Sequence, residues 1–363
     1  MSSSQLSTAS CTFPNPRYAE AIATRLQSLL EEAAQRWQDV GSWATDVLPR
    51  LADFACRGKL LRGQLVLIGA AAAGSRPSRV LLDCAAALEL FHTSVLIHDD
   101  VIDQDQLRRG LPAMHVQLAS ALRARGERLR ADTHGTALAI CAADCGFFLS
   151  FSILAQLRVP ESVRRALLKL WSEEFAHVIL AQMDDVHLSP GTTPAPREAI
   201  WRVYLYKTAR YTFCLPLMTG LLVAGAPAAL RRSLMAYAEQ LGLLFQLKDD
   251  ELGLFGSSAE TGKPVGSDIL QNKKTLYHHY LLTCTSPEIR AKIEQLFGAP
   301  QLHTHDIAFI RRVLRDTGIY ATLRATASHL ATRARRIATR LPVPPRVRAQ
   351  LLQLVDFSEA RSA

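Results

Sequence analysis

The sequence predicts an all-α protein, a single large helical bundle, and three observations support this. Apolar residues recur at helical spacing through nearly the whole chain. Alternating apolar and polar runs are absent from the sequence, as are hairpin signals such as Asn-Gly between β-branched segments. With 363 residues, of which 48% are apolar and 21% charged, the chain can bury a large core.

Capping residues locate the expected helices. Asn15 and Pro16 suit the N-cap and the first position of a helix over Arg17–Gln38. Ser78 suits the N-cap of a long helix that ends near Asp103. Further helical periodicity covers 133–157, 160–186, 196–224, 227–252, 287–298, 304–316, 318–340 and 343–356.

The same periodicity predicts the domain organisation. We expect one domain over residues 17–356, a disordered tail at 1–16 and a second tail at 357–363. The predicted loops are Leu188–Pro196 and Gly253–Asp268. No internal repeat or low-complexity linker divides the sequence.

Composition argues against several classes of protein. No run approaches the ~18 apolar residues of a membrane-spanning helix. The N-terminal residues lack the basic and apolar regions of a signal peptide. Seven cysteines without a CxxC pair fit reduced thiols better than a disulfide framework or a zinc site. We therefore expect a cytoplasmic protein with no membrane span.

The basic residues favour an anionic ligand. The net charge is +9, and only 8 of the 42 basic residues are Lys. Six of the Lys residues fall in four short segments: 59–62, 207–212, 245–253 and 262–276. A compact ammonium group suits phosphate, so these segments favour a phosphorylated ligand.

The first acidic motif is Asp99-Asp100-Val101-Ile102-Asp103. Asp99 and Asp103 are four residues apart, so on a helix they share one face, where like charges repel. A cation between them would relieve the repulsion, and carboxylate oxygens suit Mg²⁺ that bridges to substrate phosphates. Taken alone, the motif could equally be a solvated helix end.

A second acidic cluster favours the metal site. Gln246, Asp249 and Asp250 lie three and four residues apart near the end of the apolar helix expected over 227–252. Two such clusters at the ends of two apolar helices could face each other across a bundle and hold metal. A buried carboxylate cluster without a cation would be very costly.

Two other acidic groups receive a structural interpretation. Asp184-Asp185 lacks flanking basic residues, and we expect it to line a cavity or to be structural. His303 and His305 with Asp306 resemble a metal cluster, but a helix start with Asp306 near the cap explains them better.

Basic residues near the acidic motifs complete the candidate site. Lys59 and Arg62 lie on one helical face. Arg108 and Arg109 would diverge by ~100° on a helix and could serve two anions. The further candidates are Lys207, Thr208, Lys263, Lys273 and Lys274. We expect one diphosphate bound through metal and a second bound directly by Lys, Arg and His92.

In their order and spacing these motifs resemble the trans-isoprenyl diphosphate synthases (polyprenyl synthetases), in particular the geranylgeranyl diphosphate synthases. The resemblance extends from about Arg17 to Asp356. The matching motifs are Gly58-Lys59-x-x-Arg62, Asp99-Asp100-x-x-Asp103 with Arg108-Arg109-Gly110, Lys207-Thr208, Phe245-Gln246-x-x-Asp249-Asp250, and Gly262-Lys263-Pro264-Val265-Gly266-Ser267-Asp268 leading to Lys273-Lys274-Thr275.

The resemblance implies the isoprenoid synthase type I fold, an all-α bundle around a central cavity, in a homodimer with about three Mg²⁺ ions per active site. By motif position it implies Asp99, Asp103 and Asp249 as metal ligands. It implies the further catalytic residues Asp100, Asp250 and Lys207. The implied isopentenyl diphosphate site comprises Lys59, Arg62, His92 and Arg109. The implied allylic diphosphate site comprises Arg108, Lys207, Thr208, Gln246, Lys263 and Lys273.

Four positions depart from the family pattern. Gly253 stands where a third Asp is frequent in the second motif. Arg57 stands where Gly is common, and Gly63 stands where Pro is common. Ser257 replaces an expected Asp. Some members of the family share Gly at the position of Gly253, so we do not expect loss of metal binding, and Lys59 and Arg62 remain in the first basic motif.

The implied reaction is the head-to-tail (1′-4) condensation of isopentenyl diphosphate with an allylic diphosphate, giving an all-trans product. Mg²⁺ would stabilise the leaving diphosphate. The double bond of isopentenyl diphosphate would attack the allylic cation, and a proton would then be lost. The site must exclude water, because water would quench the cation.

Residues below the first motif set the expected chain length. On a helix, residue 94 lies ~7.5 Å and residue 91 ~12 Å beneath Asp99. Ser94 leaves room for growth, and Phe91 would form a deeper floor. We therefore expect geranylgeranyl diphosphate, with longer polyprenyl or farnesyl diphosphate as alternatives.

Other functions explain the motifs less well. A class I terpene cyclase needs no second diphosphate site such as Lys59, Arg62 and Arg109 would form. A non-catalytic partner subunit would be expected to lose acidic residues. The Arg-rich C-terminal third could bind nucleic acid, but its helical spacing suits a solvated face and no nucleic-acid motif accompanies it. We therefore expect no nucleic-acid partner.

Overall fold

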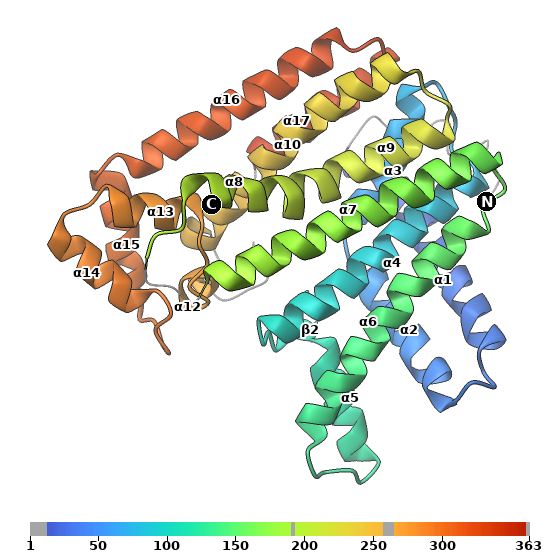
Figure 1. Ribbon diagram of the computed structural model, residues 1–363, viewed down its shortest axis with the longest axis horizontal. Coiled ribbons are helices and arrows are strands. Elements are labelled where there is room, and N and C mark those ends of the chain that lie inside the picture. The colour runs from blue at the N-terminus through green and yellow to red at the C-terminus, as the bar shows by residue number, and fades with distance from the viewer. Residues whose placement is uncertain (1–12, 190–192, 257–264, 361–363) are drawn as a thin grey trace. The chain divides into compact units, whose positions relative to one another are not determined.

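The structure is a computed structural model that describes residues 13–189, 193–256 and 265–360 (Figure 1). Helices make up most of these residues, which confirms the all-α prediction. The chain divides into two compact units. Unit 1 runs up to Lys169 and includes Pro216–Ala226, and unit 2 contains Leu170–Leu215 and the chain from Pro227 onward. The single domain expected over 17–356 stays a prediction.

Unit 1 is built around one long helix, α4. The elements of this unit are α1 (Pro16–Arg36), α2 (Ser42–Cys56), α3 (Leu61–Ala72), α4 (Arg79–Ile102), β1 (Leu107–Arg108), β2 (Leu111–Pro112), α5 (Met114–Ala124), α6 (Ala131–Ala155), the start of α7 (Glu161–Leu188) and most of α9 (Leu215–Val223). Helix α4 packs against α1, α2, α3, α5 and α6. The core of unit 1 therefore surrounds α4.

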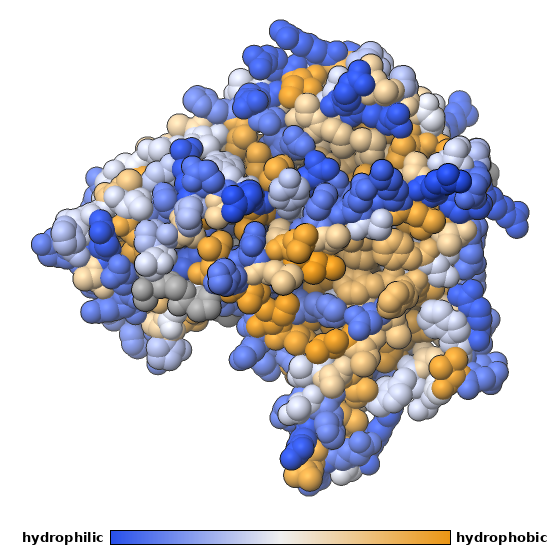
Figure 2. Space-filling view, in the orientation of Figure 1, coloured by the Kyte–Doolittle hydropathy of each residue, from blue (hydrophilic) through white to orange (hydrophobic). Residues whose placement is uncertain are grey.

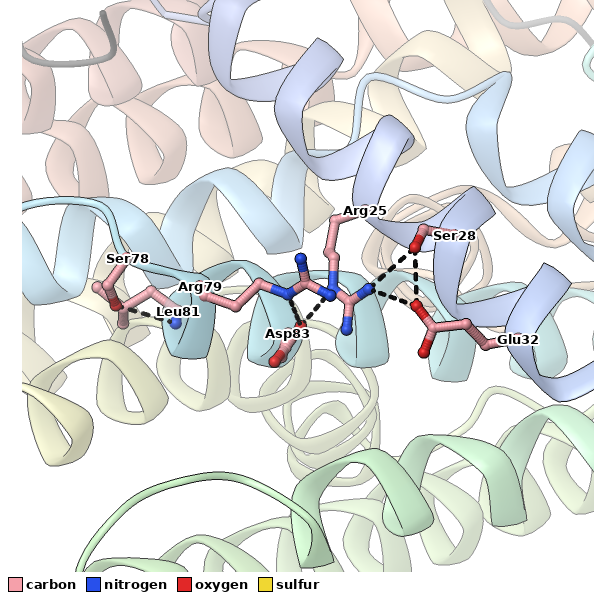
Figure 3. Close-up of polar contacts among 7 residues, drawn as sticks. All are labelled: Arg25, Ser28, Glu32, Ser78, Arg79, Leu81 and Asp83. Atoms are coloured by element: carbon pink, nitrogen blue, oxygen red, sulfur yellow. Dashed lines mark hydrogen bonds and ion pairs between the residues drawn. The ribbon is translucent and has the colours of Figure 1, made fainter. Parts of the chain in front are cut away.

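The predicted caps form. The side chain of Asn15 accepts a hydrogen bond from the backbone N–H of Arg17 at 3.1 Å, so α1 starts at Pro16. Ser78 Oγ accepts from the N–H of Leu81 at 3.4 Å, which starts α4 as predicted (Figure 3). Each cap satisfies an N–H that has no partner within its own helix.

A buried ion pair joins α1 to α4 (Figure 3). The guanidinium of Arg25 is 9% exposed and donates to Asp83 of α4. Within α1 it also donates to Ser28 at 3.1 Å and to Glu32 at 3.2 Å. Arg79 lies 3.4 Å from the same Asp83 carboxylate. These contacts keep the Arg25 charge satisfied where little water reaches it.

Unit 2 is built around a second long helix, α10. The elements are the remainder of α7, α8 (Arg197–Val203), the π-helix η2 (Tyr204–Cys214), α10 (Ala228–Phe255), α12 (Ser267–Leu270), α13 (Leu276–Thr283), α14 (Pro287–Leu296), α15 (Thr304–Asp316), α16 (Ile319–Arg340) and α17 (Pro345–Glu359). Helix α10 packs against η2, α12, α15, α16 and α17. The predicted helices of this unit agree with the structure to within a few residues.

The structure also corrects several sequence expectations. The helix expected over 196–224 changes to π-helical pairing at η2. Helices α2, α3, α5, α12 and α13 and the β1–β2 hairpin were not predicted. Residues 357–359 belong to α17, where Ser358 is fully buried, so they are not part of a tail. Asn15 and Pro16 likewise belong to the start of α1, while residues 1–12 of the expected tail lie outside the described residues.

The expected loops and the predicted cap at Asp306 have different outcomes. Helix α10 continues to Phe255 and α12 begins at Ser267, so the loop expected from Gly253 starts later, and its residues 257–264 lie outside the described residues. The side chain of Asp306 accepts from the N–H of His303 at 3.0 Å, which confirms Asp306 as a capping residue of α15.

Two helices of unit 1, α4 and α6, are long and apolar enough to cross a membrane by length and composition. Within an apolar 18-residue stretch of each helix, the buried share is 67% in α4 but only 44% in α6. The α4 value suits the central helix of a folded core, whereas α6 keeps apolar residues at its surface. The absence of a membrane span stays a prediction.

Replacing Asp83 by Ala should lower the free energy of unfolding by about 1–3 kcal/mol, because the buried Arg25 guanidinium loses a charged acceptor. The exposed Arg123–Asp132 pair offers a matched control, and Asp132→Ala should change stability by no more than about 0.5 kcal/mol. Chemical denaturation of the two variants measures both values. Equal losses would contradict a special role for the α1–α4 pair.

Candidate active site

Each central helix carries an acidic motif near its C-terminal end. In unit 1, Asp99 and Asp100 lie in the last turn of α4 and Asp103 is its C-cap. In unit 2, Asp249 and Asp250 lie near the end of α10. A helix C-terminus has a partial negative charge, so carboxylates there are unfavourable for stability. This placement indicates a function that needs concentrated negative charge.

The two aspartates of each pair have different surroundings. Asp99 is half-buried and Asp249 is exposed, so both leading carboxylates can reach a ligand. Their neighbours Asp100 and Asp250 are buried, with exposed fractions of 0% and 5%. The second aspartate of each pair therefore interacts with the protein interior.

Arg108 holds the buried carboxylate in unit 1. Its Nε donates to Asp100 Oδ1 at 2.7 Å and its Nη2 donates to the same oxygen. Nη2 also donates to Asp105 at 3.2 Å and lies 3.9 Å from Asp99. Burial raises the pKa of Asp100 to about 6, although Arg108 opposes this shift. Arg108, which the resemblance assigns to the allylic diphosphate, thus also organises the acidic motif.

A short hairpin sends the two adjacent arginines in different directions. Strand β1 pairs with β2, and the two residues between them, Arg109 and Gly110, have φ values of 54° and 76°. Positive φ at both central positions is the requirement of a type I′ turn. The expected divergence of Arg108 and Arg109 is therefore present, but a turn produces it rather than a helix.

Arg109 is directed toward the end of α2. Its Nη1 donates to the carbonyl of Phe54 at 3.0 Å. A Cβ added at Gly58 would lie 2.7 Å from the Arg109 guanidinium, so Gly58 provides the space that this side chain occupies. Arg109 is thereby brought beside the Gly58-Lys59 segment, as the motif predicts.

Two buried side chains hold the segment that carries Lys59 and Arg62. Helix α3 begins at Leu61 after the left-handed Leu60, so Lys59 precedes the helix, and the expectation that Lys59 and Arg62 share one helical face is wrong. Gln64 is fully buried and donates to the carbonyl of Lys59 at 2.8 Å. Glu89 of α4 is 3% exposed and accepts from the N–H of Gly63 at 2.7 Å. This N–H lies in the first turn of α3, whose N-cap residue makes no side-chain capping bond, so Glu89 takes that role.

His92 acts as a neutral group. Burial lowers its pKa well below the usual value, and the positive charges of Arg62, Arg109 and Arg108 lower it further. The imidazole is therefore uncharged at neutral pH and can offer a hydrogen bond but no charge to an anion. This refines the expectation that Lys, Arg and His92 together bind a diphosphate.

The two predicted chain-length residues pack against α6. Ser94 is fully buried, and its Oγ donates to the carbonyl of Leu90 at 3.2 Å. A Cβ added at Gly146 of α6 would lie 2.2 Å from this hydroxyl. Phe91 is 4% exposed, with ring centroids 4.5 Å from Phe147 and 6.3 Å from a second α6 phenylalanine. Both side chains thus contribute to the α4–α6 contact.

A chain of hydrogen bonds surrounds the buried carboxylate in unit 2. Thr208 Oγ1 donates to Gln246 Oε1 at 2.5 Å, and Gln246 Nε2 donates to Asp250 Oδ1 at 2.8 Å. The hydroxyl of Tyr204 donates to Asp250 Oδ2. Burial raises the pKa of Asp250 well above its usual value, and the charges of Asp268 and Asp249 add to this effect.

The lysines of unit 2 have different environments. Lys207 Nζ lies 2.6 Å from Asp185, so the aspartate pair interpreted as structural has a basic partner. Lys274 is 6% exposed and donates to Asn272 at 2.6 Å, and burial lowers its pKa to about 8. Its neighbour Lys273 is half-buried. The candidate Lys263 lies outside the described residues.

The missing third aspartate of the second motif has a counterpart in space. A Cβ added at Gly253 would lie 2.4 Å from Oδ2 of Asp268. The Asp268 carboxylate therefore occupies the position that a larger side chain at residue 253 would require. Gly253 thus does not leave this part of unit 2 without an acidic group.

The carboxylates fit Mg²⁺. Asp100 Oδ2 is buried and has no hydrogen-bond partner among the described residues, while Asp99 and Asp249 are accessible. Within residues 13–189, 193–256 and 265–360, no three His, Cys, Asp or Glu side chains gather closely enough to hold an ion. Proteins commonly bind Mg²⁺ through one or two carboxylates while water and substrate phosphates complete the shell, and accessible carboxylates such as Asp99 and Asp249 can provide such ligands.

The structure brings most predicted residues together within their own unit. Unit 1 groups the first acidic motif with Arg108, and groups Arg109 with the Gly58-Lys59 segment. Unit 2 groups Thr208 and Gln246 with the second acidic pair. That the two motifs meet across a cavity stays a prediction.

Sequence reasoning did not assign four residues of these groups: Gln64, Glu89, Tyr204 and Asp268. Spacing could have indicated two of them. Glu89 lies three residues before His92, and Tyr204 lies three residues before Lys207.

Comparison with known proteins identifies the family. Residues 46–314 match the polyprenyl synthetase family. The (2E,6E)-farnesyl diphosphate synthase of Mycobacterium tuberculosis H37Rv is 29% identical over 309 residues, covering 84% of this chain and 80% of that protein. The geranylgeranyl diphosphate synthase of Sulfolobus acidocaldarius is 31% identical over 247 residues, covering 65% of this chain and 68% of that protein.

A solved structure agrees over most of the chain. The geranylgeranyl pyrophosphate synthase of Corynebacterium glutamicum, complexed with isoprenyl diphosphate and magnesium, has a TM-score of 0.89 at 30% identity. The match covers 95% of this chain and 99% of that one. The chain therefore belongs to the polyprenyl synthetase family, as its motifs predict, and is a prenyltransferase.

Proposed function

We propose that this prenyltransferase condenses isopentenyl diphosphate head to tail with an allylic diphosphate and releases an all-trans polyprenyl diphosphate. The main support is the pairing at the end of each central helix, where an accessible aspartate adjoins a buried aspartate held by the protein. Family membership and the two sets of basic residues agree with this proposal. No Ser, Cys or His nucleophile is required.

The roles of the residues follow from their placement. Asp99, Asp103 and Asp249 would hold Mg²⁺, which supplies Lewis-acid stabilisation of the departing diphosphate. The relative complexed with isoprenyl diphosphate and magnesium supports this assignment. Arg108 and Lys207 would add positive charge beside the leaving group. Lys59, Arg62 and Arg109, with a neutral hydrogen bond from His92, would bind isopentenyl diphosphate.

We propose geranylgeranyl diphosphate as the main product. Ser94 is small and directed toward Gly146, so no bulky side chain stands at this level of α4. The ring of Phe91 packs against Phe147 and Phe151 of α6, and Phe147 also lies 5.2 Å from the ring of His98, which directly precedes the acidic motif. Relatives with both farnesyl and geranylgeranyl names match the chain, so product length needs a direct test.

Purified enzyme with Mg²⁺, labelled isopentenyl diphosphate and C5, C10 or C15 starters should yield mainly C20 product. Phe91→Ala should lengthen the product because it removes a ring that packs against Phe147. Ser94→Phe should shorten the product, whereas the control Ser94→Ala should leave it unchanged. Chromatography of the dephosphorylated prenols measures chain length. A wild-type enzyme that stops at C15 would contradict the C20 proposal.

Replacing His92 by Gln should change the KM for isopentenyl diphosphate by no more than about threefold, because one neutral donor replaces another. Arg62→Gln should raise this KM by roughly 10- to 100-fold, because it removes a charged donor. The pKa of His92 is already low, so raising the pH from 6 to 8 should change wild type and His92→Gln alike. A pH dependence present only in the wild type would show that His92 binds as a cation.

We also propose a homodimer that uses the outer face of α6. Apolar side chains lie among polar ones on the surface of the protein (Figure 2). On α6 the exposed fractions are 40% for Ile140 and 76% for Phe148. Exposed residues recur at helical spacing on this face: Ala137, Ile140 with its neighbour Cys141, Cys145 and Phe148. Such a stripe is the pattern of a helix that packs against a partner.

Phe148→Glu should convert the dimer to a monomer, because it places a charge on the last residue of this stripe, where the apolar side chain is 76% exposed. Leu129→Glu is a matched control, since Leu129 is 85% exposed but precedes α6. Size-exclusion chromatography with light scattering gives the mass of each variant. A Phe148→Glu variant that stays dimeric would exclude this face as the interface, and wild type that requires detergent would favour a membrane contact instead. We further propose a cytoplasmic location, and the six cysteines among the described residues, none of which forms a disulfide there, agree with it.

A further inference from the structure

The Tyr204 hydroxyl links three segments of unit 2. Tyr204 is 4% exposed and is the first residue of the π-helix η2. Its hydroxyl donates to Asp250 Oδ2 of α10 and accepts from the backbone N–H of Leu276 at 3.1 Å. Leu276 is the first residue of α13, immediately after the Lys273-Lys274-Thr275 sequence. One side-chain oxygen therefore joins η2, the second acidic motif and the start of α13.

The partners of Asp250 differ from those of Asp100. In unit 1 the buried carboxylate has a cation, Arg108, within hydrogen-bond distance. In unit 2 the hydrogen-bond donors to Asp250 among the described residues are Tyr204 and Gln246, and both are neutral. A buried carboxylate that loses a donor is left with an unsatisfied oxygen. The position of Asp250 therefore depends on the Tyr204 hydroxyl more than a cation-paired carboxylate would.

The same hydroxyl completes the start of α13. The first N–H groups of a helix have no partner within the helix. Thr275, the N-cap, accepts from His278 N–H at 3.2 Å, which leaves the Leu276 N–H to Tyr204. The hydrogen bonds accepted by the Thr275 side chain and by the Tyr204 hydroxyl hold the backbone in place directly after Lys273 and Lys274. Tyr204 thus connects the acidic end of α10 to a segment with two lysines.

We propose that Tyr204 is a positioning residue that aligns the second acidic motif and the Lys273–Thr275 segment for a magnesium-bound allylic diphosphate. This inference rests on the proposed function. Tyr204 does not itself touch substrate. It acts through Asp250, which adjoins the accessible Asp249, and through the start of α13. Residues that hold metal-site carboxylates commonly affect metal affinity or activity by 10- to 100-fold.

The test compares two single-oxygen deletions in one helix. Tyr204→Phe removes the bridging hydroxyl and keeps the buried ring. Tyr206→Phe is the control, because Tyr206 lies in η2 beside His177 and Arg210 and takes no part in the hydrogen bonds to Asp250. For the full-length variants we would measure the Mg²⁺ concentration that gives half-maximal condensation. The rise in Tm caused by Mg²⁺ with inorganic pyrophosphate is a second readout that needs no turnover.

Tyr204→Phe should need roughly tenfold more Mg²⁺ in both measurements, with a higher KM for the allylic substrate. Its KM for isopentenyl diphosphate should not change, because the residues proposed for that ligand belong to unit 1. Tyr206→Phe should match wild type throughout. Adding Tyr204→Phe to Asp250→Asn should cause little further loss of the pyrophosphate-dependent Tm rise.

Three results would overturn the assignment of Tyr204. These are a Tyr204→Phe variant with an unchanged Mg²⁺ requirement, a lower ligand-free Tm as its only effect, or a full additional loss in the Asp250→Asn background. If wild type itself neither condenses the substrates nor gains Tm with Mg²⁺ and pyrophosphate, the proposed function fails and the role of Tyr204 fails with it. The wild-type measurement therefore separates the two conclusions.

Discussion

The burial of Asp100 and Asp250 is the constraint on which the rest of the site depends. A carboxylate removed from water needs hydrogen-bond donors, and each unit supplies at least one of them from a segment outside its central helix. In unit 1 the donor comes from the hairpin after α4, and in unit 2 it comes from η2 and from Gln246 of α10 itself. Because each buried carboxylate is held in this way, the aspartate before it is presented toward solvent at a helix end where negative charge is otherwise unfavourable.

Two residues near the proposed isopentenyl diphosphate site have an unfavourable backbone conformation. Leu60 and Arg109 both have left-handed φ values, 48° and 54°, although neither is Gly or Asn. Such conformations cost free energy and persist only where the surroundings enforce them. Leu60 is buried beside the segment tied by Gln64, and Arg109 is held by the carbonyl of Phe54. Leu60 follows Lys59, and Arg109 is itself a cation proposed to bind the same diphosphate, so at these two positions the left-handed backbone sets the direction of a binding side chain.

The sequence predicted the all-α class and most helix positions because period and capping are local signals. Asn15, Ser78 and Asp306 show this, since each cap depends on residues within three positions. The π-helical pairing of η2 was not predictable in this way, because its residues have ordinary helical periodicity. The β1–β2 hairpin was missed because its strands have two residues each and its turn is Arg-Gly rather than Asn-Gly.

The site residues also divide into those that sequence signals predict and those that they do not. Motif residues such as Asp99 and Lys207 could be named from order and spacing, since the family pattern is linear in sequence. Glu89, Tyr204 and Asp268 act through contacts with residues 15 to 72 positions away, and the sequence does not reveal these partners. Helical spacing from His92 and Lys207 could at most have marked Glu89 and Tyr204 as neighbours of motif residues. The direction of a side chain was not predictable either, because the sequence alone does not show that Ser94 turns toward Gly146.

The approach of Asp268 to Gly253 limits which side chains residue 253 can carry. An aspartate there would meet the carboxylate of Asp268 and repel it, so the two positions are not independent. A larger side chain at residue 253 fits only if the Asp268 side chain turns away. The small residue in α10 and the carboxylate in α12 therefore form a matched pair within unit 2.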